Sequence, residues 1–223
     1  MNNPDKNQQI QKLPELTPEM MEEEYEIERR RIAFLDSALA SLQDSQREKL
    51  MSNLLQVAAE TIQGLNQKLS KTQEILLPPT GRIQIRLQIM NAEEAKWHDG
   101  RENRRIAAAT ASRATNTISL LNHLALAPKE VIRRMVTHEC LHLSFPFATK
   151  KESPIRKTVR LEYPPECHQE EEWVRRMEER LCGRVNHFLA WEIAVEKSGP
   201  NWRDTYYQLK KSPSMLQDND YSN

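Results

Sequence analysis

The sequence predicts a helix-rich α+β fold with a small sheet. Long segments near both ends of the chain have apolar residues at helical spacing. Residues 82–89 instead alternate strictly between polar and apolar side chains, which is typical of a half-buried strand. Residues 114–121 provide a second strand candidate. Because strands and helices occur in separate runs, an α+β arrangement is favoured over regularly alternating units.

The N-terminal part predicts a tail followed by a helical hairpin. Residues 1–16 are polar, rich in Asn, Gln and Lys at their start, and are expected to be disordered. Thr17-Pro18-Glu19 is typical of a helix start, because threonine caps and proline fits the first turn. Ser45-Gln-Arg-Glu48 resembles a capping box that opens a second helix. We therefore predict two antiparallel helices within residues 17–77, and expect them to pack on the domain that follows.

A turn-rich segment, Leu77-Pro-Pro-Thr-Gly81, separates this hairpin from the rest of the chain. We predict a single domain over residues 82–211. The later elements are predicted in chain order: strands over 82–89 and 114–121, a metal-binding helix after Pro128, a long amphipathic helix over 173–197, a short helix over 202–209, and a flexible tail over 212–223.

Composition favours a soluble protein without a strong electrostatic field. The 223 residues include 32 Lys and Arg and 32 Asp and Glu, so the formal net charge is zero. No apolar run approaches the length of a membrane span, and the N-terminus lacks the apolar core of a signal peptide. The cysteines are odd in number and not spaced as CxxC, so no disulfide framework is indicated. A cytoplasmic location is expected.

The strongest chemical signal is His138-Glu-Cys-Leu-His142 on a predicted helix. Histidines four residues apart lie on one side of a helix and can bind one zinc ion. Glu139, about 100° further round the helix, can reach a metal-bound water as general base. A buried glutamate between two histidines would be costly unless a metal or hydrogen bonds compensated it. The motif therefore predicts a zinc site.

A catalytic zinc site normally has three protein ligands and an open position for water. His168, near the expected start of the second long helix, is the clearest third candidate. The alternative is an exposed histidine at the helix N-terminus, where the acidic run that follows complements the helix dipole. Glu171 and Glu172 are rival ligands, and Cys167 is a weaker one. The spacing alone leaves this choice open.

The other titratable residues are assigned structural roles. His123 is expected at the surface or supporting the site, although His123, Tyr163 or an arginine can also be considered as oxyanion donors. His98 and His187 have no partner pattern, and Cys140 is expected in the core, away from the metal.

Three segments resemble the SprT-like and YgjP-like zinc metallopeptidases: Ile118-Ser-Leu-Leu-Asn-His-Leu124, Pro128-Lys-Glu-Val-Ile132, and His138-Glu-Cys-Leu-His-Leu143. The later His168 to Trp173 also has the family's spacing. The resemblance covers roughly residues 82–181 and implies a zincin-like core. It implies that His138, His142 and His168 are zinc ligands and that Glu139 is the base. It also implies that the strand before the metal-binding helix forms the sheet edge on which an extended substrate lies.

The resulting prediction is a zinc-dependent metallopeptidase that hydrolyses peptide bonds in a protein or peptide substrate. One alternative is a metal-binding but non-proteolytic interaction module, which would explain the helical hairpin. The other is a DNA-associated SprT-like protease, because residues 81–165 contain 15 Lys and Arg against 8 Asp and Glu. A solvated charged surface is favoured over nucleic-acid binding, since no aromatic residues interleave with the basic ones. No membrane partner is expected, and the oligomeric state is left open.

Overall fold

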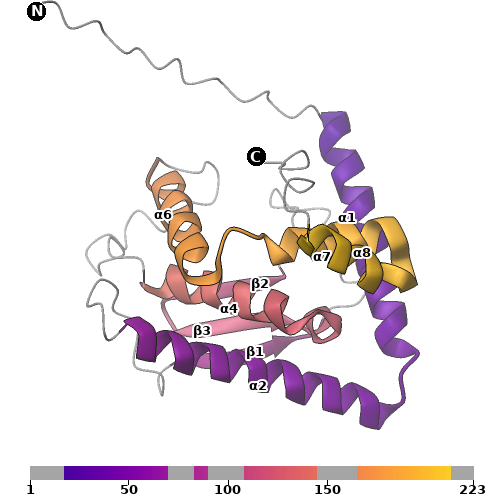
Figure 1. Ribbon diagram of the computed structural model, residues 1–223, viewed down its shortest axis with the longest axis horizontal. Coiled ribbons are helices and arrows are strands. Elements are labelled where there is room, and N and C mark those ends of the chain that lie inside the picture. The colour runs from indigo at the N-terminus through magenta and orange to yellow at the C-terminus, as the bar shows by residue number, and fades with distance from the viewer. Residues whose placement is uncertain (1–17, 70–82, 90–107, 145–164, 212–223) are drawn as a thin grey trace, which may run out of the picture.

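The computed structural model describes residues 18–69, 83–89, 108–144 and 165–211, and these form a helix-rich α+β arrangement (Figure 1). The described elements are, in order, α1 (Pro18–Ala40), α2 (Asp44–Leu69), β1 (Gln84–Gln88), β2 (Ala109–Ser112), β3 (Thr117–Leu121), the 3-10 helix η3 (Asn122–Leu126), α4 (Lys129–Ser144), α6 (Pro165–Cys182), α7 (His187–Ser198), the 3-10 helix η5 (Gly199–Asn201) and α8 (Trp202–Lys211). The predicted fold class is confirmed at this level. The predicted terminal tails, residues 1–16 and 212–223, lie outside the described residues.

The sheet is small and mixed, with the strand order β1-β3-β2. β1 pairs parallel to β3, with Ile85 opposite Ile118, and β2 pairs antiparallel to β3, with Ala111 also opposite Ile118. Asn116, in the turn between β2 and β3, has φ 50°, a conformation that Asn tolerates better than most residues. The strand that precedes the metal-binding helix is therefore the central one, and the expectation that it would form the substrate edge is wrong.

The two predicted strands were located correctly, although β3 begins at Thr117 and the residues before it form the turn. Strand β2 was not predicted. Its sequence, Ala109-Thr-Ala-Ser112, is short and weakly apolar, so it gives no clear period-two pattern.

The N-terminal helices do not lie antiparallel to one another. In Figure 1, α2 runs across the foot of α1, and each helix packs elsewhere: α1 on η3 and α7, and α2 on α4, η3 and β1. Helix α2 begins at Asp44, before the predicted capping residue Ser45, and the side chain of Gln46 accepts a hydrogen bond from the backbone N–H of Gln43. Buried residues of both helices, including Leu35 and Leu54, join the core of the remaining elements, as expected for packing on the domain.

The C-terminal helices differ from the single long helix predicted over residues 173–197. Helix α6 ends at Cys182, and Gly183 follows with φ 86°, a conformation that favours glycine at a helix end. Asn186 then caps α7 by accepting a hydrogen bond from the backbone N–H of Leu189. The predicted short helix from Trp202 is confirmed as α8.

Helix α4 occupies the middle of the molecule and contacts α2, α6, α7, β2 and β3 (Figure 1). Pro128 precedes its first residue, and its carbonyl accepts hydrogen bonds from Val131 and Ile132. The fully buried Val131, Ile132 and Val136 place one side of α4 in the hydrophobic core. Within the described residues, no helix has both the length and the apolar character that a membrane span requires.

Candidate metal centre

Helix α4 brings His138 and His142 together as the spacing predicts. Their Nε2 atoms are 3.1 Å apart, and the two rings meet edge to face, with centroids 4.8 Å apart and planes at 70°. Both side chains are partly exposed, so the region between the nitrogens lies at the margin of the core. One nitrogen of each ring thus points toward a shared position.

The other ring nitrogens are held by carboxylates from α6. Nδ1 of His138 lies 3.0 Å from Glu178 Oε2, and Nδ1 of His142 lies 2.7 Å from Glu170 Oε1. An ionised carboxylate only accepts hydrogen bonds, so these contacts assign the ring proton to Nδ1 in both histidines. Both Nε2 lone pairs are then left facing one another.

The pKa of Glu170 supports an ionised carboxylate. Burial alone would raise this pKa, but the hydrogen bond from His142 and the positive charge of Arg113 together outweigh burial and lower it. Glu170 therefore remains an acceptor near neutral pH.

Facing lone pairs repel one another unless a cation or a proton lies between them. Two imidazole nitrogens bound to one tetrahedral zinc ion at its usual bond length would be about 3.3 Å apart. The observed separation of 3.1 Å is close to this value. Neutral imidazoles whose Nδ1–H groups bond to carboxylates are also a common arrangement of zinc ligands. The two histidines therefore fit a zinc ion.

Each of these glutamates also pairs with an arginine. Arg134, one turn before His138 on α4, forms an ion pair with Glu178 and donates hydrogen bonds to the carbonyls of Gly183 and Val185. These contacts join α4 to α6 and to the loop after it.

The second arginine comes from the turn between β2 and β3. Arg113 forms an ion pair with Glu170, and its Nε donates to the backbone carbonyl of His142 at 2.5 Å. The sheet, the end of α4 and the N-terminal half of α6 thus converge on His142.

Glu139, the predicted base, is buried, with 5% of its surface exposed. The next residue, Cys140, lies fully in the core as predicted, and burial together with the charge of Glu139 raises the pKa of its thiol to about 12. Cys140 is therefore neutral and does not compete for a metal.

The proposed third ligand lies on α6, but the side chains of Cys167, His168 and Glu171 are outside the described residues. Glu172 is described: its side chain is 63% exposed and forms an ion pair with Arg176, one turn further along α6. Among the described side chains, no group of three or more His, Cys, Asp or Glu residues is arranged to hold a metal ion. The described side chains thus bring together two candidate ligands, His138 and His142.

Of the remaining histidines, the two whose side chains are described, His123 and His187, do not join this centre. His123 is buried in η3, contrary to the expected surface position, and its Nε2 lies 3.7 Å from Asp36 of α1. His187 has a structural setting, with its Nδ1 3.3 Å from the hydroxyl of Tyr206. His98 and Tyr163 lie outside the described residues.

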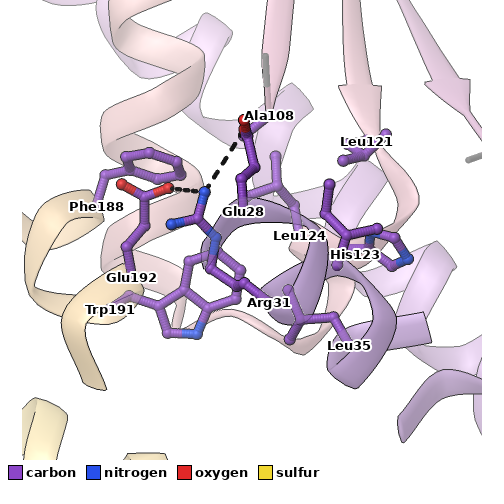
Figure 2. A pocket seen from close by; sticks show the side chains of 11 residues that line it. Glu28, Arg31, Leu35, Ala108, Leu121, His123, Leu124, Phe188, Trp191 and Glu192 are labelled. Atoms are coloured by element: carbon purple, nitrogen blue, oxygen red, sulfur yellow. Dashed lines mark ion pairs between the residues drawn. The ribbon is translucent and has the colours of Figure 1, made fainter. Parts of the chain in front are cut away.

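A separate small cavity of about 30 Å³ lies between α1, η3 and α7 (Figure 2). Its side is formed by an ion pair between Arg31 and Glu192, 2.7 Å apart, over Phe188 and Trp191. His123 also lines it, but in Figure 2 its imidazole is directed away from this ion pair. The volume suits one or two water molecules and is far below that of a typical ligand pocket.

Sequence reasoning missed the four residues that hold the histidines: Arg113, Arg134, Glu170 and Glu178. Glu170 was interpreted only as an acidic residue at a helix start. The ion pairs and hydrogen bonds span 28 to 57 residues, so no local spacing reveals them. The only local signal is that Arg134 and Glu178 each occupy a position where the helical spacing calls for an apolar residue. A charged side chain at such a buried position requires a partner.

Comparison of the chain with protein-family models, curated proteins and solved structures finds no match.

Proposed function

We propose that the protein is a zinc-dependent peptidase. In this proposal His138, His142 and His168 hold the metal, and Glu139 is the general base. The observation that carries it is the pair of Nε2 atoms facing each other at 3.1 Å, with both Nδ1 atoms engaged by carboxylates. This arrangement leaves two neutral donor nitrogens at zinc-like spacing.

The position of α6 supports a third ligand from its N-terminal part. Glu170 bonds to Nδ1 of His142, so the backbone two residues earlier, at His168, lies in the same region of α6. The exposed Glu172 is a poorer candidate, because it pairs with Arg176 on the solvent side. His168 therefore remains our proposed ligand, and Glu171 its main rival.

The chemistry follows from these groups. Zinc in such a site supplies a Lewis acid that activates water and polarises the scissile carbonyl. Glu139 takes a proton from the attacking water and transfers it to the leaving amine as the peptide bond breaks. Glu170 and Glu178 keep the two imidazole rings turned so that Nε2 of each faces the metal position, and they make these nitrogens stronger donors.

The sheet offers a place for an extended peptide. Within the described residues, β2 pairs only with β3, and it also contacts α4. We propose that an extended substrate adds, through backbone hydrogen bonds, to the edge of β2 that no described strand occupies, as in other cases of strand addition. Since β2 ends immediately before Arg113, this edge leads toward the histidine pair.

The test is zinc content measured together with peptide cleavage. Purified wild-type protein is expected to contain about one zinc per chain by elemental analysis. His142→Ala is expected to lose most of the zinc, whereas Glu139→Gln should keep it and cleave an unfolded protein substrate roughly 10²–10⁴-fold more slowly. Equal zinc in wild type and His142→Ala would contradict the proposal.

The burial of Glu139 supports a second function, a metal-dependent interaction module without proteolysis. A base that is only 5% exposed has little access to a substrate in the described arrangement. This function predicts full zinc content with no cleavage by the wild type, and no difference between wild type and Glu139→Gln. The same two measurements therefore separate the two functions.

The structure offers less support for a DNA-associated protease. Two of the basic residues counted between positions 81 and 165, Arg113 and Arg134, are engaged with glutamates of α6. The basic clusters at 101–105 and 150–157 lie outside the described residues. Nucleic acid is therefore not part of our proposal.

A further inference from the structure

We infer that two arginine–glutamate pairs are positioning residues for the metal-binding histidines. The Arg134–Glu178 pair orients His138, and the Arg113–Glu170 pair orients His142. This inference rests on the proposed function and deepens it, because it identifies the groups that prepare the site before metal binds.

The first step concerns the rings. A free imidazole can carry its proton on either nitrogen and can turn over about its bond to Cβ. The contacts of 3.0 Å to Glu178 and 2.7 Å to Glu170 fix both choices, since each carboxylate requires a proton on the Nδ1 that it touches. Each Nε2 is thereby kept as an acceptor that points toward the other histidine.

The second step concerns the glutamates. The side chains of Arg134 and Glu178 are 5% and 10% exposed, so an unpaired carboxylate at this position would be strongly disfavoured. The guanidinium neutralises the carboxylate and holds it on the Nδ1 side of the ring. Without its arginine, each carboxylate would be free to turn toward the bound zinc ion and coordinate it. The arginines therefore keep the glutamates out of the metal's own ligand shell.

The third step concerns what anchors the arginines. Arg134 also donates to the carbonyls of Gly183 and Val185 in the loop after α6. Arg113 also donates to the carbonyl of His142 from the turn between β2 and β3. Each arginine thus ties its glutamate to a second part of the fold. Metal affinity is therefore coupled to the docking of α6 on α4.

Helix α6 itself provides a matched control. Glu172 and Arg176 form an ion pair of the same chemical type, but their side chains are 63% and 72% exposed and they touch neither histidine. Neutralising Glu172 alters the charge of α6 by the same amount as neutralising Glu170 or Glu178. Any effect specific to the latter two must arise from their contacts with the histidines and with the arginines that hold them.

The experiment measures zinc affinity of the full chain by competition with a chelating dye. Glu170→Gln and Glu178→Gln are each expected to weaken zinc binding roughly 10–100-fold, the usual range for loss of such supporting carboxylates. Glu172→Gln should bind zinc as the wild type does. Circular dichroism checks that each variant is folded. If Glu178→Gln unfolds, zinc affinity is still measured in Glu170→Gln, because the Arg113–Glu170 pair is more exposed and its loss is less damaging to folding. Unchanged affinity in folded Glu170→Gln and Glu178→Gln would overturn the inference.

A second readout does not depend on metal. Nitrogen-15 NMR of the metal-free wild type should show His138 and His142 protonated at Nδ1 and unprotonated at Nε2 near pH 8. Glu170→Gln should weaken this preference at His142, and Glu172→Gln should leave it unchanged. Protonation at Nε2 with a bare Nδ1 in the wild type would overturn the inference. A wild type with this tautomer that binds no zinc would contradict the proposed function alone.

Discussion

Helix α4 has an apolar face and a polar face, and different forces hold them in place. On one face, Ile132, Val136 and Cys140 are fully buried in a core that also includes residues of α2 and the sheet. On the other face, Arg134, His138 and His142 meet glutamates of α6 and the Arg113 turn. The first face is stabilised by removing apolar area from water, whereas the second requires that every charge has a partner.

This difference indicates which face of α4 tolerates amino-acid substitutions. An apolar face tolerates substitutions that conserve volume, because its contacts are not directional. The polar face is less tolerant, because each Arg–Glu–His chain has a defined order and removal of one member leaves a buried charge. Function is expected to reside on the second face, and stability on both.

The largest expected effect comes from breaking the polar face at Arg134. Replacement by Met removes the cation and leaves the buried Glu178 with His138 as its remaining polar partner, which should lower the free energy of unfolding by roughly 3–5 kcal/mol. Urea unfolding in the presence of a metal chelator measures this without a contribution from bound zinc. The control is Arg133→Met: Arg133 is adjacent but exposed, so its loss should change stability by less than about 0.5 kcal/mol. Similar stability of the two variants would contradict the comparison.

A slightly smaller effect is expected from the apolar face. Ile132 is 0% exposed, and Ile132→Ala should lower the free energy of unfolding by roughly 2–5 kcal/mol through lost burial and the cavity left behind. Zinc affinity of the folded fraction should stay unchanged, because the substitution touches no histidine partner. A loss of zinc affinity as large as that of Glu178→Gln would show that the two faces are not separable.

The sequence anticipated the apolar face better than the polar one. The strict alternation of residues 82–89 correctly placed β1, and the helix predicted after Pro128 is α4, with Cys140 in the core as expected. These signals are local, since burial repeats with the period of the element. The break between α6 and α7 also had a local signal, Gly183 and Asn186, but the apolar period across it was interpreted as continuous.

The candidate site could be predicted only where it is local. The one-turn spacing of His138 and His142 was sufficient to predict their meeting, which the structure bears out. The partners on Nδ1 depend on how α6 crosses α4, and no spacing within either helix specifies that crossing. The prediction that α1 and α2 pack antiparallel to each other was wrong for the same reason. An apolar stripe shows that a helix face is buried but not which element covers it, and here both helices pack on other elements of the core.

The smallest expected effect concerns His123, a titratable residue buried among the apolar elements. Its side chain is 2% exposed, and burial lowers its pKa below the ordinary 6.5, although the nearby charge of Asp36 acts in the opposite direction. Above pH 6.5 the imidazole is neutral in both folded and unfolded protein, and the stability associated with it is fully present. As the pH falls from 6.5 through the lower folded pKa, the unfolded chain binds a proton that the folded protein does not, so stability is lost.

Wild-type protein should therefore lose more unfolding free energy between about pH 7.5 and about pH 5.5 than His123→Gln, measured by urea unfolding of metal-free samples. The difference amounts to about 1.4 kcal/mol for each tenfold change in the proton affinity of the imidazole. Asp36→Asn should steepen the loss, because it removes the charge that raises the pKa of His123. The histidines of α4 are present in all three proteins and cancel in the comparison. If the wild type and His123→Gln respond identically to pH, then His123 is not held neutral by the core, and burial on the apolar side of the molecule is less complete than its contacts indicate.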